Sequence, residues 1–218
     1  MTDIPELTFA VLEGAAEPYA AVPTLRFTLD VESRGGASIQ SVMLTAQIRI
    51  DVGRRTYDRD TKARLVEVFG EPEQWAKSAR SLYWTHATVV VPPFEARTQV
   101  ALLVPCTYDF DVAVAKYFHG VEDGDIPLEL LFSGSMFYRD ARGLLATARI
   151  GWNAEATCRL PVRVWKEMMD HYFPNSAWLR VRRDTFDRLY AYKARHTLPT
   201  WEATLDALLP AGNAAGEG

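Results

Sequence analysis

The sequence has little of what marks disulfide-rich, membrane-spanning or nucleic-acid-binding proteins. Its only two cysteines among 218 residues are Cys106 and Cys158, and such a pair is more typical of reduced, buried thiols than of a bridge. No apolar run approaches the roughly 18 residues of a membrane helix, and the opening stretch MTDIPELTF has no signal-peptide pattern. Because 28 acidic residues outnumber 24 basic ones, a generic nucleic-acid partner is disfavoured. We therefore expect a cytoplasmic protein without a membrane span.

The familiar catalytic and cofactor motifs are also missing. The sequence contains no G-x-G-x-x-G, P-loop, H-E-x-x-H or C-x-x-C motif, and its Gly134-Ser135 pair does not complete a G-x-S-x-G elbow. Its four histidines are scattered along the chain. We therefore expect no resident cofactor, and the residues favour a non-enzymatic protein while leaving an activity open.

Apolar residues that alternate with polar ones predict a chain built mainly of β-strands. The pattern is clear in residues 24–33 and clearest in residues 41–52, and a period of two is typical of a strand with one buried face. The Gly-rich turn at 34–38 predicts that these two segments form a hairpin. Further strands are expected at residues 7–12, 82–91, 98–104, 107–118, 126–138, 143–152 and 155–161. Gly134 is expected to form a bulge in the strand at 126–138.

Helical spacing of apolar residues appears in two regions. Residues 58–80 predict an insert of one or two short helices, with Asp60 or Thr61 as its cap and Gly70 as its stop. After Pro161, the spacing predicts about three more helices. Residues 173–175 end the first of these, Asp184 caps the second, and Pro199 and Thr200 open the third.

This order of elements predicts an α+β protein. Strands followed by helices are typical of an antiparallel sandwich-like core, here of about eight strands, with the helical insert at 58–80 and the C-terminal helices packed on it. No linker rich in Pro, Gly or Ser divides the chain before residue 210. We therefore expect one domain over 1–209, β-rich in 1–160 and helical in 161–209, and a flexible tail at 210–218.

The stretch CTYDFDVAVAKYFHG, residues 106–120, raises the question of a metal site because it combines Cys, Asp and His. On a strand, Cys106 points to the core while Asp109 and Asp111 point outward. Asp111 and His119 would then lie roughly 26 Å apart, too far to share an ion. We read the aspartates as solvated acids. The alternative is a metal site of Asp109, Asp111, His119 and Asp125, which needs the strand to break near Lys116.

Two further groups of polar residues can be read in two ways. Glu167 and His171 are four residues apart and would share a helix face. Metal sites usually need three or four ligands, and no second pair stands out, so a surface pair is favoured over a metal site. The acidic turn at 122–125 contains Asp-Gly, which is more typical of a turn than of a metal loop.

The strongest local charge asymmetry lies in residues 178–195. The positions singled out there are Trp178, Arg180, Arg182, Arg183 and Arg188, opposed only by Asp184 and Asp187. One reading is a solvated helix face. The other is a docking surface for an acidic protein partner, with Trp178 as a partly exposed anchor.

Several stretches resemble an uncharacterised bacterial family of about this length. They are EPYAAVPTLRF, YDRDTKARLVEVFGEPEQW, PCTYDFDVAVAKYFHGVEDGDIPLELLFSG and the segment from RLPVRVWKEMMDHYF to the leucines near residue 209. Genes of that family often neighbour those of oxygen-tolerant [NiFe] hydrogenases. The resemblance implies an accessory or assembly role, with a hydrogenase subunit or maturation factor as the partner, and no catalytic residues to carry over.

Two other functions stay open. One is a metal- or small-ligand-binding enzyme built on the sandwich. The other is a chaperone-like holder of unfolded chains, because the expected layout, with sheet first and helices last, is similar to that of the bacterial protein-export chaperone. That second reading needs an exposed apolar groove.

Overall fold

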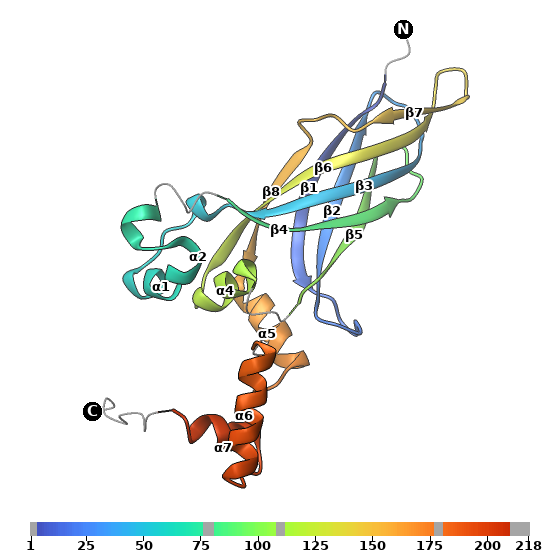
Figure 1. The fold of residues 1–218 in the computed structure, drawn as a ribbon. Coiled ribbons are helices and arrows are strands. Elements are labelled where there is room, and N and C mark those ends of the chain that lie inside the picture. The colour runs from blue at the N-terminus through green and yellow to red at the C-terminus, as the bar shows by residue number, and fades with distance from the viewer. Residues whose placement is uncertain (1–3, 76–80, 108–111, 177–180, 210–218) are drawn as a thin grey trace. The chain divides into compact units, whose positions relative to one another are not determined.

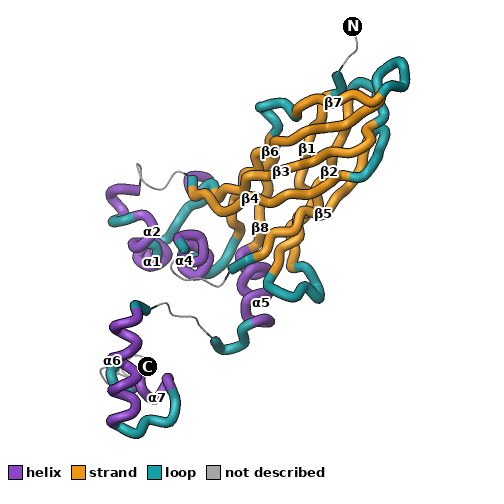
Figure 2. The backbone as a smooth tube through the Cα atoms, turned by 45° about the vertical axis from the view of Figure 1, so that its right-hand side comes forward, coloured by secondary structure: helices purple, strands orange, loops and turns teal. Residues whose placement is uncertain are grey.

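Two antiparallel sheets form the core of the protein (Figures 1 and 2). The structure is a computed structural model that describes residues 4–75, 81–107, 112–176 and 181–209. The first sheet has the order β1-β2-β5, and the second has the order β4-β3-β6-β7, with β8 also pairing with β6. The strands are β1 (Glu6–Ala16), β2 (Thr24–Arg34), β3 (Ile39–Ile50), β4 (Leu82–Val91), β5 (Arg97–Pro105), β6 (Asp125–Arg139), β7 (Leu145–Arg149) and β8 (Glu155–Pro161). The predicted α+β sandwich is confirmed.

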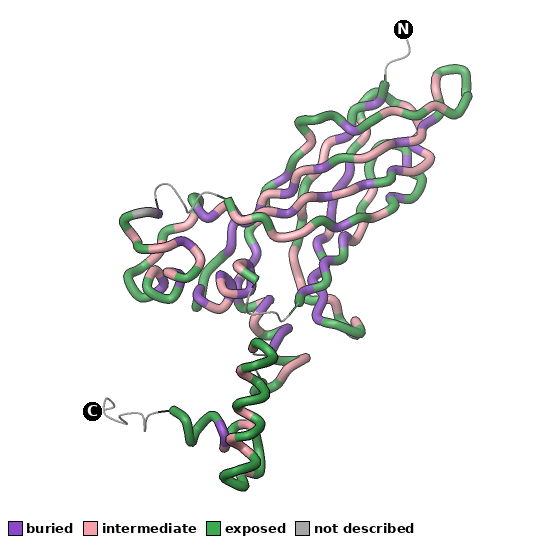
Figure 3. Tube along the Cα trace, viewed as in Figure 1, coloured by how far each residue is buried: buried purple, intermediate pink, exposed green. Residues whose placement is uncertain are grey.

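The alternating pattern of the sequence becomes the inner faces of these sheets. In β2 the residues Leu25, Phe27, Leu29 and Val31 are fully buried, while neighbours such as Arg26 and Glu32 are exposed. β3 buries every second residue from Val42 to Ile50 in the same way (Figure 3). Both strands thus contribute apolar faces to one hydrophobic core.

The predicted hairpin between β2 and β3 is wrong. β2 pairs with β1 and β5, whereas β3 pairs with β4 and β6. Gly35 and Gly36 have φ values of 111° and 69°, and the chain passes through them from one sheet to the other. An apolar strand face can be buried across the sandwich as well as beside a neighbouring strand, so periodicity alone did not decide the pairing.

Gly134 marks the place where β6 changes its neighbour. Residues 125–131 of β6 pair with β8, and residues 135–139 pair with β7. The register with β3 is unbroken there, so the predicted bulge at Gly134 is not present in that ladder. Gly134 has a φ of 145°, and a Cβ atom on it would lie 1.9 Å from the Met43 carbonyl oxygen, so only glycine fits.

The helical insert lies between β3 and β4, as predicted. It contains α1 (Arg59–Arg64) and α2 (Val66–Phe69), flanked by short 3₁₀ turns at Val52–Arg54 and Pro72–Gln74. The cap is Asp58 rather than Asp60 or Thr61, because the Asp58 carboxylate accepts a hydrogen bond from the Thr61 amide at 2.6 Å. Gly70 ends α2 with a φ of 77°.

The strand predicted over 107–118 is wrong, because the chain there forms helix α4 (Ala113–Gly120). Val114, Tyr117, Phe118 and Val121 are all buried, and their spacing of three, four and seven residues is that of a helix. Together with α1 and α2, α4 lies at one end of the sandwich (Figure 1). The distance expected between Asp111 and His119 on a strand therefore does not apply.

Three helices follow β8. Helix α5 (Val162–Tyr172) packs against β1, β8 and α4. Helices α6 (Arg183–Arg195) and α7 (Trp201–Asp206) belong to a second compact unit, residues 179–218, which is described by itself. Thr200 caps α7 as predicted, whereas the N-cap of α6 is Arg182 rather than Asp184. The single domain over 1–209 stays a prediction. In the described ranges, no helix has both the length and the apolar character to cross a membrane.

Candidate functional site

The residues considered for a metal site do not gather in the described part of the chain. Asp109 and Asp111 lie outside the described residues. His119 lies in the last turn of α4 with its ring 5.0 Å from that of Trp165, and burial, together with Lys166, lowers its pKa. Asp125 is exposed at the start of β6. Within the described ranges, no three His, Cys, Asp or Glu side chains are grouped to hold an ion.

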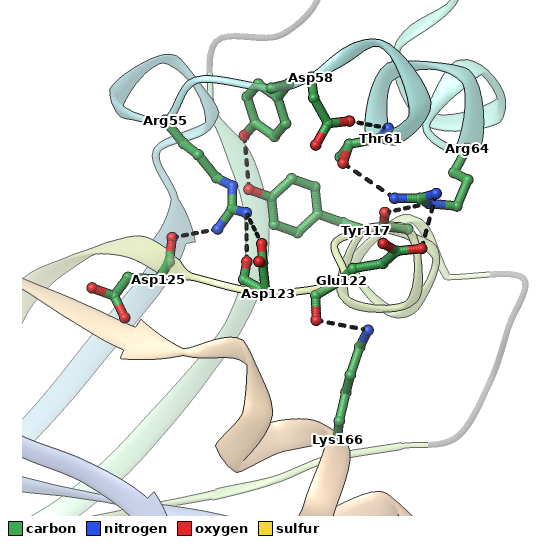
Figure 4. A network of polar contacts seen from close by, with 11 residues as sticks. Arg55, Asp58, Thr61, Arg64, Tyr117, Glu122, Asp123, Asp125 and Lys166 are labelled. Carbon is green, nitrogen blue, oxygen red and sulfur yellow. Dashed lines mark hydrogen bonds and ion pairs between the residues drawn. The ribbon is translucent and has the colours of Figure 1, made fainter.

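The acidic turn at 122–125 is held by cationic side chains (Figure 4). Arg64 forms an ion pair with Glu122 at 3.0 Å. Arg55 donates hydrogen bonds to the backbone carbonyls of Asp123 and Asp125, at 2.5 and 2.7 Å. These contacts anchor the helical insert to the start of β6, so the described contacts of the turn are structural.

A pair of tyrosines lies beside this anchor. The Tyr57 and Tyr117 hydroxyls are 2.7 Å apart, and the Tyr57 hydroxyl also donates to the Val52 carbonyl at 3.1 Å. Burial is the main cause that raises the pKa of both phenols. A phenol with a raised pKa stays protonated at neutral pH and makes a poor base. The pair therefore fixes α4 against the insert.

Neither cysteine has the environment of a nucleophile. Both thiols are free, with Cys106 buried and Cys158 half-buried. Burial raises the pKa of each thiol to about 12. Reactive cysteines have lowered pKa values and positive surroundings, so these two act as small core residues.

The predicted basic surface is only partly free of counter-charges. Trp178 and Arg180 lie outside the described residues. Arg182 forms an ion pair with Asp184, and Arg183 lies 3.6 Å from Asp187. Arg188 makes a long hydrogen bond to Thr185 at 3.5 Å and forms no ion pair among the described residues. The cationic character of α6 is therefore weaker near its start than the sequence suggested.

Aromatic side chains on α6 and α7 form a cluster that we call the aromatic face: Phe186, Tyr190 and Trp201. The ring of Phe186 is 5.3 Å from that of Trp201, and the ring of Tyr190 is 6.3 Å from both. Lys193 lies 6.0 Å above the Trp201 ring. Phe186 remains 42% exposed and Tyr190 60% exposed.

The helix pair buries very little of itself. No residue of α6 is buried, and Thr204 is the one buried residue among 181–209 (Figure 3). Leu205, Leu208 and Leu209 of the same unit are also exposed. A cluster of large apolar side chains left in water is a feature of interaction surfaces. The spacing of Phe186 and Tyr190, four residues apart, already indicates one shared side of the helix, but the sequence did not reveal that this side is exposed.

A second site that the sequence did not reveal is a pocket between the end of β1 and α5. It has a volume of about 380 Å³, and Glu167 and His171 line it together with Glu13 and Glu17.

Trp152 is a surface residue that the sequence analysis did not single out. It is 97% exposed in the turn between β7 and β8, where the Gly-Trp-Asn sequence is a turn signal.

Residues 4–217 match the model of a family of unknown function (DUF6084), and the chain belongs to that family. A search of curated proteins gave no match.

Solved structures give only distant likenesses. The CARDB domain of a Pyrococcus furiosus protein, solved in complex with di-metal ions, is 11% identical over 73% of this chain and 94% of that chain, with a TM-score of 0.29. A putative late embryogenesis abundant protein is 13% identical over 73% of this chain and 71% of that chain, with a TM-score of 0.31. A β-glucosidase from Thermotoga neapolitana is 14% identical over 72% of this chain and 17% of that chain, with a TM-score of 0.26. At these TM-scores the likenesses say nothing about function.

Proposed function

We propose that this protein is a non-enzymatic, cytoplasmic accessory protein that binds a protein partner through the aromatic face of α6 and α7. The observation that carries the proposal is the exposure of Phe186 and Tyr190 in a unit whose one buried described residue is Thr204. Two short helices with so small a core gain little stability from their own packing. A partner that covers the aromatic face would supply the missing apolar contact.

The charges of α6 suggest the chemistry of that partner. Across residues 182–195, five cationic side chains oppose Asp184 and Asp187. Arg188 carries no ion pair among the described contacts, so it is available to an acidic group on the partner. Aromatic residues and arginine are the types that most often dominate binding energy at interfaces. The fitting partner therefore presents an apolar patch bordered by Asp or Glu.

The gene neighbourhood implied by the family resemblance makes a [NiFe] hydrogenase subunit or maturation factor the first partner to test. Affinity purification of the tagged protein from its native cell, followed by mass spectrometry, gives the candidate. The discriminating variant is Phe186→Ser with Tyr190→Ser, because both side chains are largely exposed and belong to the second compact unit.

A matched control removes two other exposed apolar side chains, from the outer side of the second sheet: Met43→Ser with Val90→Ser, which are 58% and 64% exposed. We expect one protein to be recovered with the unmodified chain and the control, and its yield to fall about tenfold with the α6 variant. Equal recovery with both variants would remove the aromatic face from the proposal. Recovery of no protein above an untagged sample would refute the accessory function itself.

A further inference from the structure

The pocket between β1 and α5 is built from two segments that lie about 150 residues apart in the chain. One wall is the end of β1 and the following loop, residues 13–19, and the other is the face of α5 that carries Val164, Glu167, Met168 and His171. The Tyr172 hydroxyl donates a hydrogen bond to the Ala20 carbonyl at 2.5 Å, which ties the loop to the helix. The base of the loop is closed by the Glu17 amide, which donates to the Thr24 carbonyl at 2.8 Å. These contacts fix the loop against α5 beside the pocket.

This pocket is lined mainly by acidic groups, which lie beside the imidazole of His171. Glu13, Glu17 and Glu167 contribute carboxylates, and the lining residues include no lysine or arginine. Glu17 is already neutralised by Arg26, whose Nη2 lies 2.6 Å from its carboxylate and whose hydrogen bonds lower the pKa of that carboxyl group. Among the described residues, neither Glu13 nor Glu167 has an ion-pair partner. Two solvent-exposed carboxylates without an ion pair among the described residues thus line the pocket from its two walls.

The surface between the carboxylates is apolar. It is formed by Val164, Met168, Pro18 and the small residues of 14–16. A divalent metal ion would not fit this arrangement, because it needs a compact shell of oxygen or nitrogen ligands. No three such side chains are grouped among the described residues. A volume of about 380 Å³ is instead in the range of small-molecule pockets.

We propose that this pocket binds a linear polyamine, with one ammonium group at Glu13, another at Glu167 and the alkyl chain across Val164 and Met168. Charge-assisted hydrogen bonds from ammonium to carboxylate give such a ligand its orientation. The methylene groups between them bury apolar surface that an inorganic cation could not cover. A ligand with a single ammonium group leaves one of the two carboxylates without a partner.

Titration calorimetry with spermidine, on the full chain in about 0.15 M salt, tests the site. We expect one bound spermidine per chain and binding of butylamine that is about tenfold or more weaker, because only one charged contact is formed. Equal affinity for the two amines would overturn the two-ended mode. If millimolar spermidine gives no heat of binding, the site is overturned.

Matched charge variants separate the pocket from the general attraction of an acidic protein. Glu13→Gln with Glu167→Gln removes the two free carboxylates, and Glu202→Gln with Asp206→Asn removes the same charge from α7. We expect the first pair to weaken spermidine binding about tenfold and the second to change it less than about twofold. Equal losses would show non-specific binding and refute the proposal. Should the first pair unfold the protein, backbone amide shifts of the unmodified chain decide the matter: they must move at residues 13–19 and 164–172.

Discussion

Removing the hydroxyl of Tyr57 should destabilise the protein more than removing the hydroxyl of Tyr117, although the two hydroxyls share one hydrogen bond. In Tyr117→Phe, the Tyr57 hydroxyl keeps its bond to the Val52 carbonyl at 3.1 Å, so the loss is one hydrogen bond, about 1 kcal/mol. In Tyr57→Phe, that carbonyl loses its donor, and the Tyr117 hydroxyl loses its partner at 2.7 Å on a side chain that is fully buried. Leaving a buried polar group unpaired costs about 1–3 kcal/mol, so we expect a total of about 2–3 kcal/mol.

Urea unfolding of the two single variants and the double variant measures these values and the coupling between the hydroxyls. The coupling energy should be about 1 kcal/mol, because each single variant breaks the same bond. Equal losses in the two single variants, or additivity in the double variant, would refute the hydrogen-bond assignment. Phe69→Leu is a useful control, since its ring lies 6.1 Å from that of Tyr117 and carries no hydroxyl group.

The same pair predicts a dependence of stability on alkaline pH. Burial raises the pKa of both tyrosines in the folded protein, so the folded state binds these protons more tightly than the unfolded chain. Their contribution is complete below the unfolded pKa of about 10 and declines as pH rises above it. The slope is at most about 1.4 kcal/mol per pH unit for each tyrosine. Stability that does not change between about pH 9 and 11 would contradict this.

Two further predictions test packing and chemistry. Gly134→Ala should lower the free energy of unfolding by more than about 3 kcal/mol, because a Cβ atom would lie 1.9 Å from the Met43 carbonyl. Gly143 has a φ of 76° and open space around it, so Gly143→Ala should lower it by only about 1–2 kcal/mol. Similar losses of stability in thermal unfolding of the two variants would contradict the assignment. Both thiols should react slowly with dithionitrobenzoate at about pH 8 in the folded protein, because a pKa of about 12 leaves only about a ten-thousandth of each as thiolate. They should react at once in denaturant, and fast labelling of the native chain would show that a thiol is accessible and ionised.

Strands with one buried face were predicted well because burial itself imposes the period of two. Residues 82–91 and 155–161 form strands with the predicted bounds. The pairing of β2 and β3 was not accessible, since an apolar face does not identify the surface that covers it. Helix α4 was missed because Val114 and Phe118 satisfy both periods. The deciding residue was Tyr117, which a strand would turn to the same side as Asp109 and Asp111 and which the structure buries completely.

The two surfaces proposed to bind ligands were accessible to very different degrees. The charges of α6 are contiguous in the sequence, so the segment could be singled out although its ion pairs could not. Glu167 and His171 were recognised as a pair on one helix face. Nothing in the sequence connected them to Glu13 and Glu17, because only the packing of α5 against β1 brings these segments together.

The order of strands in the two sheets also governs how the chain can fold as it is synthesised. The second edge of β2 can pair only after residues 97–105 have been synthesised, and β3 can pair with β6 only after residues 125–139 have been synthesised. A nascent chain that has emerged only as far as the helical insert therefore carries β2 with one edge unpaired and β3 with both edges unpaired, because β4 and β6 follow the insert. Their apolar sides then lack part of their cover. Such distant pairings are reached slowly, on a scale of roughly milliseconds to seconds. During translation this protein should accordingly depend on shielding by ribosome-associated factors until β6 has left the exit tunnel.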